Sequence, residues 1–129
     1  MNREHRIYKG DSLIIHIHGG GFIALDSNDH QSYLRSWANK TQVPVFSIDY
    51  RLAPEFPFPL ALDDVWQGYK YLVENVEKLF GIRPEKILMT GDSAGGNLAI
   101  ALTLWCIKIG YRKPNILFPC YPALNLDLN

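Results

Sequence analysis

Short apolar runs alternate along this chain with longer stretches in which apolar residues recur three and four positions apart. The short runs have the length of buried strands, and they cover residues 12–21, 43–50, 86–91 and 115–124. The longer stretches have the spacing of amphipathic helices, and they cover residues 28–41, 58–81 and 94–109. Buried strands that alternate with helices form a parallel sheet covered on both faces. The pattern therefore predicts an α/β fold of three layers with a mostly parallel open sheet.

The composition fits one ordinary globular domain. The 129 residues are enough for one core but few for a complete α/β enzyme. Basic and acidic residues balance at 13 each, so neither a nucleic acid nor an anionic membrane is an expected partner. No apolar run reaches the roughly 18 residues that span a bilayer, and the N-terminus lacks the apolar segment of a secretory signal. Cys106 and Cys120 lack the spacing of a disulfide framework, so we expect reduced thiols and a cytoplasmic protein.

Two glycine-rich segments follow predicted strands, at the edge where open parallel sheets bind their ligands. The first reads HGGG at 18–21 and the second reads GDSAGG at 91–96. The first lacks the third glycine of a dinucleotide fingerprint, because Ala24 or Leu25 stands in its place. The second is followed by Asn97 and Leu98, where a phosphate loop needs a lysine and a hydroxyl. Neither segment predicts nucleotide binding, and no organic cofactor is expected.

The second segment matches a pattern typical of serine hydrolases. Residues 91–95 fit G-x-S-x-G, in which the serine projects from a sharp and strained strand-to-helix turn. Gly91 and Gly95 would be needed because the chain crowds against the sheet at such a turn. The helix that begins at Ala94 would direct free N–H groups at the same place. The alternative is a tight turn in which Ser93 only caps the helix.

The first segment suits an oxyanion loop, because consecutive glycines let main-chain N–H groups approach a substrate carbonyl. His16 and His18 alternate onto one face of the preceding strand, which could indicate a metal pair. No Cys, Asp or Glu stands at a spacing that would add a third ligand. We therefore expect no metal site, and we expect His16 to be a hydrogen-bonded strand residue.

Three segments together resemble the signatures of a known family. HGGGF at 18–22, DYRLAPEFPFP at 49–59 and GDSAGGNLA at 91–99 are similar to those of the hormone-sensitive lipase family of α/β-hydrolases. The resemblance extends from about Leu13 to Pro122. It implies an α/β-hydrolase-like sandwich and a carboxylic-ester hydrolase, an esterase or lipase that acts on neutral, acyl-bearing small-molecule or lipid substrates.

The resemblance also implies roles for individual residues. Ser93 would be the nucleophile, and the oxyanion hole would consist of the N–H groups of Gly20, Gly21 and Ala94, with Gly19 completing the loop. Support within the same motifs would come from His18, Gly91, Asp92 and Gly95. The resemblance implies that residues 49–55 brace the loop. The alternative, which we favour, is a purely structural turn anchored by proline with an Arg51–Glu55 ion pair.

The sequence after the serine lacks two members of a catalytic triad. In α/β-hydrolases an acid and then a histidine follow the serine, but after Ser93 the one acidic residue is Asp127 and there is no histidine. The histidines, at positions 5, 16, 18 and 30, all precede the serine. His30 opens a predicted helix after the glycine loop and could lie near the site, but no carboxylate is visible to orient it as a base.

We therefore expect residues 1–129 to be part of a hydrolase catalytic domain that is incomplete at its C-terminus and inactive alone. The alternative is a non-catalytic, receptor-like protein that binds a small molecule in a hydrolase scaffold. The last predicted strand, ending at Leu124, would leave an exposed sheet edge. Self-association through that edge is the protein contact that we expect.

Overall fold

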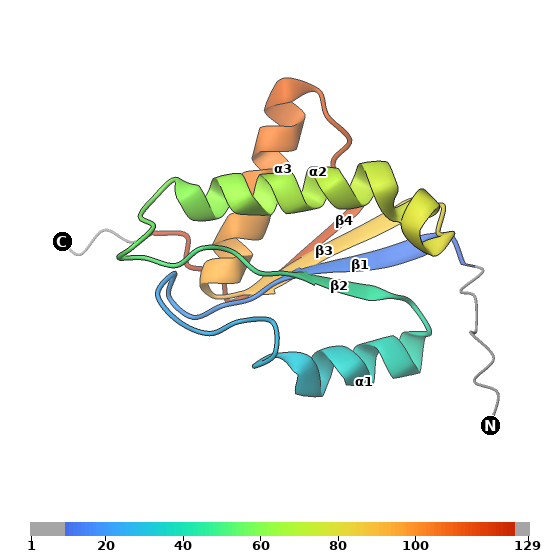
Figure 1. The fold of residues 1–129 in the computed structure, drawn as a ribbon, viewed down its shortest axis with the longest axis horizontal. Coiled ribbons are helices and arrows are strands. Elements are labelled where there is room, and N and C mark those ends of the chain that lie inside the picture. Colours follow the sequence, from blue (N-terminus) through green and yellow to red (C-terminus); the bar gives the residue numbers. More distant parts are fainter. Residues whose placement is uncertain (1–9, 126–129) are drawn as a thin grey trace.

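The computed structural model describes residues 10–125, which form a four-stranded sheet with helices on both faces (Figure 1). All strands are parallel, in the order β2-β1-β3-β4. The strands are β1 (Ser12–Ile17), β2 (Val45–Ile48), β3 (Lys86–Asp92) and β4 (Ile116–Cys120). The helices are α1 (Gln31–Thr41), α2 (Leu60–Phe80) and α3 (Ala94–Ile109). α1 lies on one face of the sheet and α2 and α3 lie on the other, so the predicted three-layer α/β fold is confirmed.

The centre of the sheet holds the core. Leu13, Ile15 and Ile17 of β1 and Ile87 and Met89 of β3 are all buried, as expected for parallel strands covered on both faces. α2 contributes an apolar stripe at helical spacing, with Val65, Tyr69 and Val76 buried. α3 contributes Leu98, Ala99, Leu102 and Cys106 to the core. The two central strands are therefore rigid supports for the loops that leave their carboxyl ends.

Several predicted elements are shorter in the structure, β1 and α2 among them, and three others show a local reason. β2 covers only Val45–Ile48 of the predicted 43–50, and Pro44 accepts a hydrogen bond from Ile14 just outside it. β4 ends at Cys120 rather than at Leu124, because Tyr121 has a positive φ of 34° that breaks the extended backbone. α1 begins at Gln31 rather than at residue 28, after a turn closed by the N–H of Gln31 and the carbonyl of Asn28.

The flank formed by β4 and the second half of α3 is unusually apolar for a surface. β4 is an edge strand of the sheet, and among residues 10–125 no strand pairs with its outer side. The exposed apolar side chains of β4, of the second half of α3 and of the loop after β4 include Leu104, Ile107, Ile109, Ile116, Phe118, Tyr121 and Leu124. An edge with apolar neighbours is a template for pairing with another chain.

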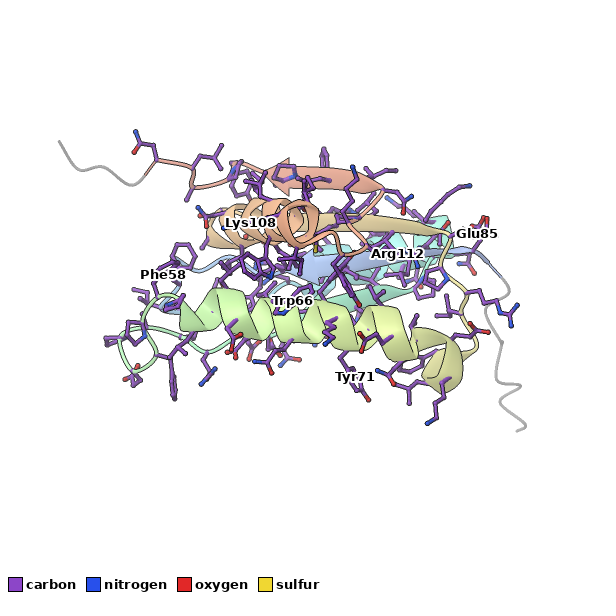
Figure 2. The ribbon with its side chains drawn as sticks, turned by 90° about the horizontal axis from the view of Figure 1, so that it is seen from above. Phe58, Trp66, Tyr71, Glu85, Lys108 and Arg112 are labelled. Atoms are coloured by element: carbon purple, nitrogen blue, oxygen red, sulfur yellow. The ribbon has the colours of Figure 1, made fainter. Side chains whose placement is uncertain are left out.

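We predict that the 129-residue chain self-associates through this flank. Phe118→Lys would place a charge on the edge strand and is expected to reduce association, because charged side chains block edge pairing. Tyr71→Lys is a matched control, since Tyr71 and Phe118 are both 56% exposed and Tyr71 lies on the side of α2 turned away from α3 (Figure 2). Light scattering at tens of micromolar measures the effect. A monomeric wild-type chain would contradict the prediction.

Candidate active site

Both glycine-rich segments meet at one edge of the sheet. β1 and β3 are neighbouring parallel strands, and their register pairs Ile17 with Gly91. The segment that starts at His18 and the turn that contains Ser93 therefore leave the sheet side by side, at its carboxyl edge. This is the position at which open α/β sheets bind their ligands.

Ser93 occupies a strained turn between β3 and α3. Its φ of 51° and ψ of −115° are unfavourable for a residue with a side chain, as the elbow pattern predicts. The main chain is held there by three hydrogen bonds. Its N–H donates to the carbonyl of Cys120 at 3.0 Å, and its carbonyl accepts from the N–H groups of Asn97 at 3.1 Å and Ala123 at 3.2 Å.

The Ser93 side chain does not cap α3, so the alternative of a capping serine is wrong. Among residues 10–125 its hydroxyl has no hydrogen-bond partner, and the residue is only partly buried. A strained backbone that presents an unpartnered hydroxyl needs an explanation beyond local structure.

Two glycines are required here by close approach of the main chain. A Cβ added to Gly91 would lie 2.5 Å from the carbonyl oxygen of Gly95 and 2.7 Å from that of Ile17. A Cβ added to Gly95 would lie 2.5 Å from the carbonyl oxygen of His18 and would also overlap that of Ile17. These contacts are with the backbone, which cannot move aside as a flexible side chain can. The predicted reason for both glycines is confirmed.

The glycine loop is held so that the N–H groups of Gly20 and Gly21 stay free of partners among residues 10–125. Nδ1 of His18 donates to the carbonyl of Gly19 at 2.6 Å, and the carbonyl of Gly20 accepts from the N–H groups of Ile23 and Ala24. In a trans peptide the N–H points opposite to the carbonyl. The N–H groups of Gly20 and Gly21 therefore point away from these bonds. Gly20 is half-buried and Gly21 is exposed, so the loop can reach a ligand.

The segment 49–55 contacts this loop, as the resemblance implies and contrary to the purely structural turn that we favoured. The hydroxyl of Tyr50 donates to the carbonyl of His18 at 2.8 Å, and its ring stacks on the His18 ring with centroids 4.2 Å apart. The N–H of Ala53 donates to the carbonyl of Phe22 at 2.8 Å. The loop is therefore anchored at both of its ends.

The predicted Arg51–Glu55 ion pair is wrong. Arg51 instead binds Asp64 in the first turns of α2, with Nε and Nη2 at 2.8 and 2.7 Å from its carboxylate oxygens. The guanidinium holds the pKa of Asp64 below its usual value. A spacing of four residues brings side chains together only on a helix, and residues 51–55 are not helical.

The expectation that His30 lacks a carboxylate partner is also wrong. Its Nε2 lies 3.2 Å from the carboxylate of Asp92, and its Nδ1 lies 3.1 Å from the carbonyl oxygen of Asp26. Both ring nitrogens face acceptors, so neither directs a lone pair at Ser93. His30 is therefore held on both sides by residues of the fold. His5 and Asp127 lie outside the described residues.

His16 is the predicted hydrogen-bonded strand histidine. Its side chain is 1% exposed, with Nδ1 2.9 Å from the hydroxyl of Ser47 and Nε2 2.9 Å from that of Tyr33. Burial, and then the neighbouring His30, lower the pKa of His16 from 6.5 to about 4. His16 is therefore neutral at neutral pH. The hydroxyl of Tyr33, whose pKa is raised by burial, stays a donor to Asp92.

We predict that His16 makes the fold sensitive to acid. Between pH 6.5 and pH 4 the unfolded chain binds a proton at His16 that the folded protein does not, so the free energy of unfolding falls as the pH falls. The loss is about 2 kcal/mol by pH 5. His16→Gln should remove this part of the pH dependence. Urea unfolding of both proteins at pH 7.5 and pH 5 measures it, and equal losses would refute the assignment.

A mainly apolar cavity of about 420 Å³ begins one helical turn beyond Ser93. Its walls include Phe22 of the glycine loop, Leu62 of α2, and Asn97 and Leu98 of α3. Phe58 projects from the loop that precedes α2 (Figure 2) and lies at the same cavity.

Among residues 10–125, no group of three His, Cys, Asp or Glu side chains is placed to hold a metal ion. No helix in the same range could cross a membrane.

Comparisons with known proteins agree with this geometry. Residues 14–129 match the family model described as the alpha/beta hydrolase fold. Hormone-sensitive lipase of Mus musculus is 44% identical over 125 residues, which is 97% of this chain and 16% of the relative. An esterase of Acinetobacter venetianus is 40% identical over 116 residues, which is 90% of this chain and 37% of the relative.

A solved structure of an esterase also has a similar fold. The hyperthermophilic esterase from the archaeon Pyrobaculum calidifontis superimposes with a TM-score of 0.86 at 36% identity, over 92% of this chain and 38% of that one. The chain therefore belongs to the hormone-sensitive lipase family of α/β-hydrolases. It spans between about a sixth and two fifths of the length of these relatives.

Proposed function

We propose that this chain carries the nucleophile and the oxyanion hole of a carboxylic-ester hydrolase. The observation that carries the proposal is the strained Ser93 turn, which leaves the sheet beside the glycine loop and whose hydroxyl has no hydrogen-bond partner among residues 10–125. The Ser93 oxygen attacks the ester carbonyl carbon, and its proton passes to a base. The tetrahedral intermediate then expels the alcohol, which takes that proton. Water cleaves the resulting acyl-enzyme to release the acid and free serine.

The N–H groups of Gly20, Gly21 and Ala94 stabilise the oxyanion in this proposal. Ala94 is the first residue of α3, and the N–H groups of a helix's first turn have no partner within the helix. The helix dipole adds a partial positive charge at the same end. Each such donor typically contributes about a hundredfold to a thousandfold in turnover.

The cavity beside α3 favours a neutral, apolar substrate. Its aromatic and aliphatic walls suit a hydrocarbon part of the ester, since each buried CH₂ stabilises binding by about 0.8 kcal/mol. A formal net charge of zero gives no electrostatic preference for an anionic substrate.

Cys106 and Cys120 are free thiols, which is consistent with a reducing, cytoplasmic location.

The base and its orienting acid lie outside this set of residues in the proposal. No histidine follows Ser93 in the sequence, and both nitrogens of His30 are directed at other groups. The longer relatives include polypeptide that this chain does not cover. We therefore propose that residues 1–129 form part of a hydrolase domain and are close to inactive alone. The second candidate is a non-catalytic receptor on the same scaffold, and a full-length sequence without that histidine would favour it.

A chimera separates the two candidates. Residues 1–129 would replace the matching segment of the Acinetobacter venetianus esterase, whose remaining sequence would complete the domain. We predict that the chimera hydrolyses an activated short-chain ester with an initial burst, whereas the 129-residue chain stays near background. A folded chimera that binds the ester without cleaving it would favour the receptor. Turnover near one per second by the 129-residue chain would show that a base is present in it.

A further inference from the structure

Asp92 connects the nucleophile turn to three other parts of the fold. Its carboxylate accepts a hydrogen bond from the N–H of Gly19 at 3.2 Å. It also faces Nε2 of His30 at 3.2 Å, the hydroxyl of Tyr33 at 3.4 Å and Nε2 of His16 at 3.5 Å. These groups belong to the glycine loop, to the N-terminal end of α1 and to β1. The proposed attack by Ser93 does not itself require such an arrangement.

We propose that Asp92 is a positioning residue whose carboxylate fixes the glycine loop beside Ser93. The inference rests on the proposed function, since it affects hydrolysis only if Gly20 and Gly21 donate to the oxyanion.

The peptide group between His18 and Gly19 is the fixed start of the loop. Its carbonyl accepts from the hydroxyl of Tyr50 and its N–H donates to Asp92, so it is held from both sides. A Cβ on Gly19 would lie 2.8 Å from the main-chain oxygen of Asp92, which shows how closely the loop approaches the turn. The next two peptide groups carry the proposed oxyanion donors. Their direction depends on this fixed start.

The donors around Asp92 also solve an electrostatic problem. A bare carboxylate next to Ser93 would raise the energy of a developing oxyanion. Here donors from α1, β1 and the loop surround the Asp92 carboxylate, which is 17% exposed, on the face of the sheet that α1 covers. The other titratable groups near it are His18, Tyr50, Cys120 and Tyr121. Asp92 can therefore hold the loop while these donors partly neutralise its charge.

Amide exchange of the ¹⁵N-labelled 129-residue chain tests the proposal without any need for hydrolysis. The Gly19 amide should exchange slowest in the wild type, faster in Asp92→Asn, which keeps a neutral acceptor, and fastest in Asp92→Ala. Losing a hydrogen bond to a charged acceptor should accelerate exchange roughly tenfold to a hundredfold. The heteronuclear NOE of Gly20 and Gly21 should fall in parallel. Asp11→Asn, at the opposite end of β1, is the matched control and should change neither.

A pH titration adds a readout that loss of packing would not produce. The Gly19 amide shift should follow protonation of the carboxylate in the wild type and should lose that response in Asp92→Asn. Equal Gly19 exchange in the wild type and the folded Asp92→Ala variant would overturn the proposal. If Asp92→Ala does not fold, equal exchange in the wild type and Asp92→Asn would do so. A Ser93 that proves unreactive in the chimera would reject the proposed function and leave these results unchanged.

Discussion

Ser93→Ala should lower the turnover of the chimera about a millionfold, because the serine and its histidine act as one unit in serine hydrolases. This corresponds to about 8 kcal/mol of transition-state stabilisation. The remaining rate, about 10³ to 10⁴ above that in water, would come from the oxyanion donors and from substrate binding. Initial rates with an activated short-chain ester measure the change.

Ser32→Ala is the control for this experiment, since Ser32 is exposed on α1 and has no part in the proposed site. Its turnover should equal that of the unmodified chimera. A Ser93→Ala chimera that keeps a tenth or more of the activity would mean that another residue is the nucleophile.

Gly95→Ala should destabilise the fold by about 3 kcal/mol or more, as a strong case of overpacking. In an ordinary helix this substitution stabilises by up to about 1 kcal/mol. Here the added methyl group would overlap the carbonyl groups of Ile17 and His18, so β1 and α3 would have to move apart. Urea unfolding of the 129-residue chain measures the difference.

Gly81→Ala provides the comparison. Gly81 ends α2 with a φ of 69°, and a Cβ there would meet nothing within 4 Å. Gly81→Ala should therefore lower the free energy of unfolding by about 1 kcal/mol, because alanine is less favourable than glycine at a positive φ. If Gly95→Ala were no more destabilising than Gly81→Ala, the close approach at the nucleophile turn would not be a constraint.

The local parts of the site could be predicted from the sequence because each depends on neighbouring residues. Gly91 and Gly95 stand two residues on either side of Ser93, so the pattern alone indicates a crowded turn. The end of β3 and the start of α3 follow from an apolar run that gives way to helical spacing. The register that places Ile17 beside Gly91 then follows from parallel strands whose carboxyl ends meet at one edge.

The supporting contacts could not be predicted, because they join segments far apart in the chain. His30 and Asp92 are 62 residues apart, and their contact depends on the path of the loop after Gly21. That path contains positive φ values at Phe22 and Leu25, which no propensity of these residues indicates. The Arg51–Asp64 pair is hidden from the sequence for a related reason. Glu55 is the acidic residue nearest to Arg51 in sequence, but the fold brings Asp64 of the next helix to it instead.

A fluorophosphonate probe tests the central claim most directly, because it reacts preferentially with an activated serine and the labelled residue can be identified by mass spectrometry. The account predicts a single adduct on Ser93 of the chimera, no adduct in its Ser93→Ala form, and weak or no labelling of the 129-residue chain. An adduct on a different residue, or none on a chimera that hydrolyses esters, would contradict it.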